Sequence, residues 1–495
     1  MKKLLSLYLL ATLGAAVSLH SAEIVSPLLR TVDLDIGESV KLKLSDGTPA
    51  TVKLLSINEI TDTMSKAVRR AEVAVEVNGE RVDLISANYH LPTTAAGVQI
   101  DCPLTKGYVA NSGSDAWGLK KAARLRLWPK GSPWINPGTF QYPAKQRWFA
   151  TATQMANEPT YADGGDKPSR KKIYYHYGLD IGGAEGLIDI VAATDGLVVS
   201  LGKEVLEGHK DSPAHPRYDV VYILDERGWY YRYSHLNAID PSLVLGKRIK
   251  MGAPIGVLGK EGGSGGWTHL HFGIKSKQPS GEWGTQEGYA FLWQAYIDEH
   301  QPKVLAVARP HHFVKTGEEV LLDGSKSWAA KGNIKDYDWK FHDGESANGA
   351  QQKRSYKKAG VYSEILKVTN ANGAIDYDFN IVQVIDANKL DKLPPTIHAT
   401  YAPTFGIKVG DEVTFKVRTF RTTIPEEIWN FGDGTPEVKV QSDGNAVKLA
   451  KDGYAVSKHR FTEAGHYVVS VQHTNENGFT ATQHLQVRVR VRVGE

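Results

Sequence analysis

Apolar and polar side chains alternate in short runs along much of this chain. In residues 72–77 and 80–84 every second position is apolar, and Asn78-Gly79 separates the two runs. Alternation with a period of two predicts half-buried β-strands, and Asn-Gly between two such runs predicts a hairpin turn. We therefore expect residues 23–125 to form an N-terminal β-rich domain.

The alternation stops after this region. Residues 128–142 are rich in proline, glycine and aromatic side chains. This composition is typical of an ordered segment between domains. We expect residues 126–145 to form a connector that runs over a domain surface.

A second set of strand-like runs follows the connector. Residues 191–201, 220–224 and 229–234 are strand-like and are separated by glycine, aspartate or proline. Apolar residues then recur at helical spacing within residues 289–300, which predicts a helix. We assign residues 146–300 to one domain that this helix closes.

The C-terminal part of the chain contains an internal repeat. Residues 338–344 match residues 428–434, and further matches lie on both sides of this pair. An insertion around residues 441–453 lengthens the second copy. The short alternating strands predict two immunoglobulin-like β-sandwiches, at residues 303–388 and 392–495. The chain as a whole is predicted to be mainly β.

Composition narrows the range of functions. The chain has 495 residues with 59 basic and 55 acidic side chains, and its formal net charge is +4. Because no basic block occurs, we do not expect nucleic acid as a partner. Cys102 is the only cysteine. No internal disulfide is therefore expected, and a buried small hydrophobic role is favoured over a nucleophile.

The N-terminal pattern predicts export. Lys2 and Lys3 precede a short apolar run at residues 4–17, and small residues follow it up to Ala22. These are the parts of a cleaved secretory signal, which we assign to residues 1–22. The apolar run is short for a membrane span, and no later segment is long and apolar enough to form one. We expect a soluble mature protein that is secreted or located in the periplasm or cell envelope.

Two histidine motifs in strand-like stretches carry the candidate chemistry. His176 and Asp180 are four residues apart, and His269 and His271 are two apart. Residues two or four apart in a strand point to the same face. Two such strands side by side would present three imidazoles and a carboxylate to one point, which is what a catalytic zinc ion needs. A further histidine, His235, lies between the motifs.

In this order the motifs resemble those of the lysostaphin/LytM-type zinc metallopeptidases, family M23. The resemblance rests on His-Tyr-Gly-Leu-Asp at residues 176–180, Tyr-Ser-His-Leu at residues 233–236 and Gly-Trp-Thr-His-Leu-His-Phe at residues 266–272. It implies an antiparallel β-sheet peptidase core of the LytM or duplicated-hybrid-motif type. It also implies a zinc metalloendopeptidase that hydrolyses amide bonds in peptidoglycan peptides.

The resemblance implies a role for each motif residue. His176, Asp180 and His271 would bind the zinc ion (Zn2+) and leave a fourth position for water. His269 and His235 would be catalytic, as general base and as stabiliser of the oxyanion. In this assignment His269 accepts the proton of the water, and His235 donates to the developing oxyanion.

Two segments depart from the family pattern. Residues 204–218 are longer and more charged than the usual turn, and they add His209 and His215, which we expect on a surface loop. Residues 262–268 are rich in glycine and contain Trp267, where relatives usually have Gly-Pro before the His-x-His motif. Substrate specificity therefore does not follow from the resemblance.

The repeat resembles the polycystic-kidney-disease (PKD) domain, an immunoglobulin-like sandwich common in bacterial secreted enzymes. The sequence Trp-Asn-Phe-Gly-Asp-Gly at residues 429–434 is close to the usual pattern, whereas the first copy has His342 in place of a glycine. The tryptophan and phenylalanine are expected in the sandwich cores. A polysaccharide or surface molecule is the candidate partner of these domains.

Three functional hypotheses follow. The first is an active zinc endopeptidase that acts on peptidoglycan stem peptides or cross-bridges. The second is a catalytically silent LytM-type regulator, and the third is a cell-surface or polysaccharide-binding protein in which the sandwiches dominate. The complete motif set favours the enzyme, because silent family members usually lack some of these residues.

Overall fold

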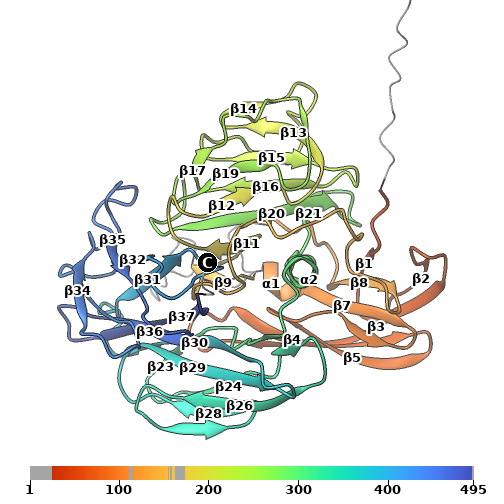
Figure 1. Cartoon of the computed structure of the whole chain (residues 1–495). Helices are drawn as coiled ribbons and strands as arrows, with labels where there is room; N and C mark the ends of the chain where they lie inside the picture. The colour runs from red at the N-terminus through yellow and green to blue at the C-terminus, as the bar shows by residue number, and fades with distance from the viewer. Residues whose placement is uncertain (1–24, 111–114, 154, 157–158, 162–172, 493–495) are drawn as a thin grey trace, which may run out of the picture.

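The computed structural model describes residues 25–110, 115–153, 155–156, 159–161 and 173–492 (Figure 1). The expected signal segment, residues 1–22, lies outside the described residues. Strands dominate the described part, which has two helices, α1 (Lys106–Ala110) and α2 (Tyr289–His300). The predicted mainly β fold class is therefore confirmed. Neither of these helices has the length and apolar character that crossing a membrane requires.

The N-terminal part forms two antiparallel four-stranded sheets that enclose one apolar core. Its strands are β1 (Arg30–Leu34), β2 (Ser39–Lys43), β3 (Pro49–Thr61), β4 (Val68–Val77), β5 (Glu80–Ala87), β6 (Thr93–Ala95), β7 (Val98–Thr105) and β8 (Ala123–Pro129). The sheet orders are β2-β3-β4-β5 and β1-β8-β7-β6. The predicted hairpin joins β4 to β5, and Asn78 and Gly79 adopt the positive φ angles of 52° and 88° that this tight turn requires.

The next part of the chain is built on an eight-stranded sheet, at the top of Figure 1. Its strands, with those of two smaller sheets, are β9 (Pro159–Tyr161), β10 (Ile173–Tyr175), β11 (Leu179–Gly182), β12 (Asp189–Val191), β13 (Gly196–Leu201), β14 (Glu204–Val205), β15 (Val221–Leu224), β16 (Tyr230–Ser234), β17 (Leu236–Ile239), β18 (Arg248–Ile249), β19 (Pro254–Leu258), β20 (His269–Lys277) and β21 (Trp283–Thr285). The large sheet has the order β11-β20-β16-β15-β13-β14, with β18 on β13 and β21 on β20. Strands β12-β19-β17 form a second sheet, and β9 pairs with β10. Helix α2 spans the residues that the helical spacing predicted.

Residues 128–142 insert aromatic side chains into a core, although Lys130, Gly131, Pro137 and Gly138 are exposed. Trp128 and Tyr142 have no exposed surface, and with Phe140 they belong to the same core as the strands of the large sheet. Aromatic side chains remove a large apolar area from water, and this stabilises the segment although most of it lacks regular structure. Phe140 packs on Tyr231 and Phe272, and Tyr142 packs on Tyr296, all far away in sequence, so no local pattern indicates these contacts.

The repeat folds as two β-sandwiches that share one sheet. Their strands are β22 (Val304–Leu305), β23 (His312–Lys315), β24 (Glu319–Asp323), β25 (Trp328–Ala329), β26 (Ile334–Lys340), β27 (Ser346–Asn348), β28 (Gln351–Ser355), β29 (Gly360–Asn370), β30 (Ile375–Ile385), β31 (Thr396–Ala402), β32 (Val413–Phe420), β33 (Glu426–Asn430), β34 (Val438–Gln441), β35 (Ala455–His459), β36 (Gly465–Thr474) and β37 (Thr480–Val489). A nine-stranded sheet passes through both copies, because β29 of the first pairs in parallel with β37 of the second. The expected core residues are buried: Trp339, Phe341, Trp429 and Phe431.

Two buried arginines connect the sandwiches to the segment after the connector. The guanidinium of Arg309 donates to the carbonyl oxygen of Thr151 at 2.6 Å and pairs with Asp378. The guanidinium of Arg147 donates to Oε1 of Gln486 at 2.7 Å. Buried guanidinium groups need such partners, because an unpaired buried charge is costly. These contacts hold both sandwiches against residues 147–151.

Candidate metal and catalytic site

Strands β11 and β20 bring three of the predicted residues together. His269 and His271 both lie on β20, where the alternation of a strand gives them the same face, as the sequence predicted. Asp180 lies on β11 directly opposite His271 in the antiparallel register. Neighbouring strands are about 4.8 Å apart, so their facing side chains can share one ligand.

His176 reaches the site by a different route from the one predicted. It lies between β10 and β11 rather than on one strand with Asp180, so strand alternation does not explain its position. The chain turns at Gly178, where a Cβ atom would lie 2.6 Å from Cε1 of His271. The absence of a side chain at this position lets the turn approach the ring of His271 closely.

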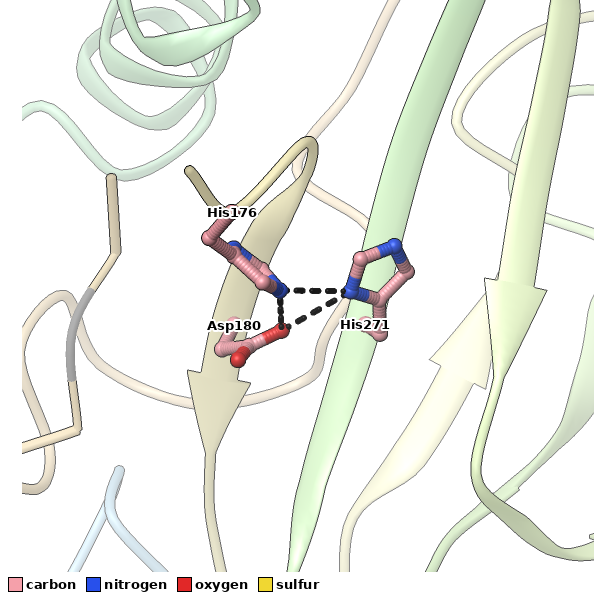
Figure 2. A group of neighbouring side chains, drawn as sticks. All are labelled: His176, Asp180 and His271. Atoms are coloured by element: carbon pink, nitrogen blue, oxygen red, sulfur yellow. Dashed lines mark hydrogen bonds and ion pairs between the residues drawn. The ribbon is translucent and has the colours of Figure 1, made fainter. Parts of the chain in front are cut away.

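The three candidate ligand atoms form a small triangle (Figure 2). Nε2 of His176 lies 3.2 Å from Oδ1 of Asp180 and 2.9 Å from Nδ1 of His271. Nδ1 of His271 lies 3.1 Å from Oδ1 of Asp180. Two ligand atoms at ordinary distances from a tetrahedral zinc ion are separated by about 3.3 Å. The donor set and its spacing therefore fit zinc.

The electrostatics of the triangle also fit a cation. His176, Asp180 and His271 are buried, with 4%, 2% and 5% of their surface exposed. Burial raises the pKa of Asp180, but the rings of His176 and His269 outweigh this effect and hold the pKa well below its ordinary value. Burial lowers the pKa of His271 to about 3. Burial also lowers the pKa of His176, but the Asp180 carboxylate more than compensates and raises it. A metal cation between these side chains would interact favourably with the Asp180 carboxylate in place of a proton on His176.

His269 and His235 form a second pair beside the triangle. Their ring centroids are 4.6 Å apart, and Nε2 of His269 lies 3.7 Å from Oδ2 of Asp180. His235 lies between β16 and β17 with a φ angle of 69°, a conformation that few non-glycine residues adopt. Burial lowers the pKa of both rings, that of His235 well below its ordinary value, so both are neutral near pH 7.

Backbone carbonyls select the tautomer of each of these rings. Nδ1–H of His269 donates to the carbonyl oxygen of Trp267 at 3.0 Å, and Nδ1–H of His235 donates to that of Glu261 at 2.6 Å. Since a carbonyl only accepts, Nε2 of each neutral ring carries the lone pair. Both rings can accept a proton at Nε2. His235 can donate to an oxyanion from this atom only after it has taken one up.

The second sandwich contacts the loop that leads into β20. The Arg418 guanidinium donates to the carbonyl oxygen of Gly266 at 2.5 Å, and Nδ2 of Asn445 donates to that of Gly265 at 3.2 Å. The backbone N–H of Thr268 donates to the hydroxyl of Tyr454 at 2.8 Å. Asn445 belongs to the insertion around residues 441–453. The segment that distinguishes the two copies of the repeat therefore contacts the loop before His269.

Two other modules contact the site at its edges. The ring of Trp267 lies between His269 and His398 of the second sandwich, with centroid distances of 3.8 and 5.7 Å. On the other side, the hydroxyl of Tyr175 accepts from the N–H of Val68 in the N-terminal domain at 2.6 Å. The sequence analysis noted Trp267 only as a departure and did not identify His398 or Tyr175 as neighbours of the site. The position of Trp267, two residues before His269, could have indicated this contact. The sequence around His398 and Tyr175 contains no comparable indication.

The remaining singled-out residues lie outside the triangle. His209 shares a hydrogen bond with the hydroxyl of Tyr230 at 3.0 Å, and His215 is exposed. In the described part of the chain, the cluster suited to a metal ion is His176, Asp180 and His271. Cys102 is buried, and this burial raises the pKa of its thiol to about 12, as expected for a small hydrophobic side chain rather than a nucleophile.

Comparison with known families agrees with this geometry. The model of peptidase family M23 matches residues 174–281, which contain all five candidate site residues. This chain contains a peptidase family M23 domain. Models of the PKD domain match residues 300–384 and 398–489, so two PKD domains follow the M23 domain.

Individual similar proteins cover smaller or more distant parts. Collagenase ColA of Clostridium perfringens (strain 13 / Type A) is 37% identical over 86 residues, which are 17% of this chain and 8% of the collagenase. The chain thus spans a small part of the length of this curated relative. The catalytic domain of lysostaphin from Staphylococcus simulans is 24% identical over 24% of this chain and 80% of that domain, with a TM-score of 0.19. Helicobacter pylori Csd3 is 15% identical over 53% of this chain and 82% of its own, with a TM-score of 0.21.

Proposed function

We propose that this protein is an exported zinc metalloendopeptidase that hydrolyses amide bonds in peptidoglycan peptides. The observation that carries the proposal is the buried triangle of His176, Asp180 and His271, with two neutral histidines beside it, inside an M23 domain. Three protein ligands leave one position for water and substrate, as catalytic zinc sites do. Export rests on the sequence of residues 1–22.

The residues divide the chemistry between them. When bound, zinc supplies Lewis acidity, which lowers the pKa of a water molecule to about 7 and polarises the scissile carbonyl. His269 accepts the proton of the attacking water at Nε2, because its Nδ1–H is held by the Trp267 carbonyl. The charged ring then lies beside the Asp180 carboxylate, 3.7 Å away, which stabilises it.

His235 completes the proposed site. Its ring is close enough to His269 to face the same reacting groups. In its neutral form it accepts at Nε2, and once protonated it donates to the oxyanion or to the leaving amine. We propose that the PKD domains supply a surface for a wall polysaccharide or another surface molecule.

A direct test is digestion of purified cell walls followed by separation of the released muropeptides. We expect the mature, zinc-loaded protein to release cross-link fragments and the His271→Ala variant to release none. Metal analysis should find about one zinc per chain, and His176→Ala should lose it. Equal release by the His271→Ala variant would contradict the enzyme hypothesis. Zinc binding without any release would instead favour the regulator.

A further inference from the structure

The sheet face that carries the zinc triangle continues into a basic region. Alternation along β20 places Gly273 and Lys275 on the same face as His271. On the neighbouring strand β16, Arg232 stands opposite Gly273, and Ser234 stands opposite His271. Arg232 is therefore one step along the same face from a candidate zinc ligand, about 7 Å along the strand.

Arg232 differs from the neighbouring arginines in having no anion beside it. Three other arginines of this domain each contact a carboxylate: Arg217 on Asp219, Arg227 on Asp225 and Arg248 on Glu226. For Arg232, Nε is buried and has no hydrogen-bond partner, and the guanidinium makes no ion pair with any residue in the part of the chain that the structure describes. A half-buried guanidinium without an anion is costly unless a ligand supplies the anion.

The surroundings of Arg232 increase the positive charge. Burial and the neighbouring Arg232 together lower the pKa of Lys275 to about 8, while Asp115 has the opposite effect. Nζ of Lys275 lies 5.0 Å from the centroid of the Tyr177 ring and donates to the carbonyl oxygen of Ala116 at 3.0 Å. Exposed His215 lies at the edge of this region. Partial burial, Arg232 and Lys275 all lower the pKa of its ring.

Gly273 lies between His271 and Arg232 on this face. A Cβ atom at this position would lie 3.7 Å from Nε2 of His271, 3.7 Å from Cβ of Arg232 and 3.8 Å from the carbonyl oxygen of Tyr177, so the Tyr177 backbone covers this buried glycine. A bound peptide must therefore pass beside the Tyr177 backbone rather than over the glycine, with one end at the triangle and the other at the guanidinium. An extended peptide advances by about 3.3–3.6 Å per residue, so the span corresponds to one or two residues.

We infer that Arg232 is a carboxylate-binding subsite that selects peptides with a free carboxylate one or two residues from the scissile amide bond. The inference rests on the proposed peptidase function and specifies its substrate class. The guanidinium would hold the carboxylate in a bidentate, charge-assisted contact. Lys275 supports it as a second positive charge.

The test compares two substrates on the full-length, zinc-loaded protein. One is a cross-linked peptidoglycan peptide with free carboxylates, and the other is the same peptide with those carboxylates converted to carboxamides. We expect kcat/KM to be about 10- to 100-fold higher for the free carboxylate. Arg232→Gln should abolish this preference, so that kcat/KM becomes equal for the two peptides, whereas Arg232→Lys should retain part of it. Arg248→Gln, a surface arginine of the same domain, is the matched control and should keep the full preference.

The inference is overturned if Arg232→Gln lowers cleavage of both peptides equally, or if the wild-type protein does not discriminate between them. Zinc content and the melting temperature identify a variant that has lost its fold. If the wild-type protein binds zinc but cleaves neither peptide, the proposed function fails on its own. Binding of both peptides to the wild-type and Arg232→Gln chains, by calorimetry, then decides the subsite: a carboxylate preference that Arg232→Gln removes supports it, and equal binding refutes it.

Discussion

The indole of Trp267 lies flat against the imidazole of His269, with ring centroids 3.8 Å apart and ring planes at 21°. The carbonyl oxygen of the same Trp267 accepts the Nδ1–H of His269. One residue therefore fixes both the plane of the proposed general base and its tautomer. Glycines precede Trp267 in the sequence, and hydrogen bonds with the second sandwich help to hold this loop in place.

Replacement of Trp267 by alanine should lower kcat more than it changes KM. Without the indole, the ring of His269 can rotate out of line, and misplacement of a catalytic group costs about 10- to 100-fold in rate. Zinc content should be unchanged, because no ligand contacts the indole. Steady-state kinetics and metal analysis measure the two effects. Trp283→Ala, on β21 of the same sheet, serves as the control, and an unchanged kcat in Trp267→Ala would refute this positioning role.

Replacement of Tyr454 by phenylalanine should loosen the loop before His269. The substitution removes the acceptor of the Thr268 N–H, and a buried donor left unpaired costs about 1–3 kcal/mol. We expect faster amide hydrogen exchange at residues 265–268. Tyr401→Phe is matched, since it removes a hydroxyl that donates to the Gln486 carbonyl inside the sandwich. Equal exchange of the loop in both variants would mean that the sandwich does not restrain it.

Gly178→Ala should weaken zinc binding although it removes no ligand. The added Cβ would lie 2.6 Å from Cε1 of His271 and 3.0 Å from the carbonyl oxygen of Phe272, so the ring or the turn must move. We expect a loss of zinc affinity of about tenfold or more, measured by competition with a chelator. Gly273→Ala meets only ordinary contacts at 3.7–3.8 Å and should keep the wild-type affinity. Equal affinities in the two variants would show that the turn is not tightly packed.

Acidification should destabilise the interface around His398. Its ring is buried between the hydroxyls of Tyr454 and Thr153, at 2.8 and 3.2 Å, and burial lowers its pKa to about 3. The unfolded chain, with an ordinary pKa near 6.5, binds a proton that the folded chain does not. The stability contribution is therefore complete above pH 6.5 and is lost as the pH falls below it. At pH 5 the loss from this one group is about 2 kcal/mol.

Urea unfolding at pH 7 and pH 5 measures this effect. The decrease in the free energy of unfolding between the two pH values should be smaller in His398→Gln than in the wild-type protein by about 2 kcal/mol. His215→Gln, at an exposed position, should reduce the decrease much less than His398→Gln. If His398→Gln and the wild-type protein lose the same free energy, the buried neutral ring does not account for the pH dependence.

Local patterns in the sequence predicted the elements whose structure is set by neighbouring residues. Helix α2 (Tyr289–His300), the turn at Asn78-Gly79 and the placement of His269 and His271 on one strand all follow from side-chain spacing. The position of His176 does not follow, because the chain leaves the strand at this point and turns through Gly178. Strand alternation predicted that His176 and Asp180 lie close together. In the structure the turn at Gly178, rather than the alternation of one strand, brings them together.

The amino-acid sequence by itself determined the mainly β class, the repeat and the residue types of the candidate site. Periodicity and motifs record short-range constraints, which each strand or turn satisfies locally. Only the tertiary structure decided that Trp128, Phe140 and Tyr142 are core, that the sandwiches share a sheet, that Arg418 and Tyr454 contact the loop before His269, and that Arg232 faces the site without an anion. These depend on contacts between residues far apart in the chain, where burial and hydrogen bonding are decided by packing rather than by spacing.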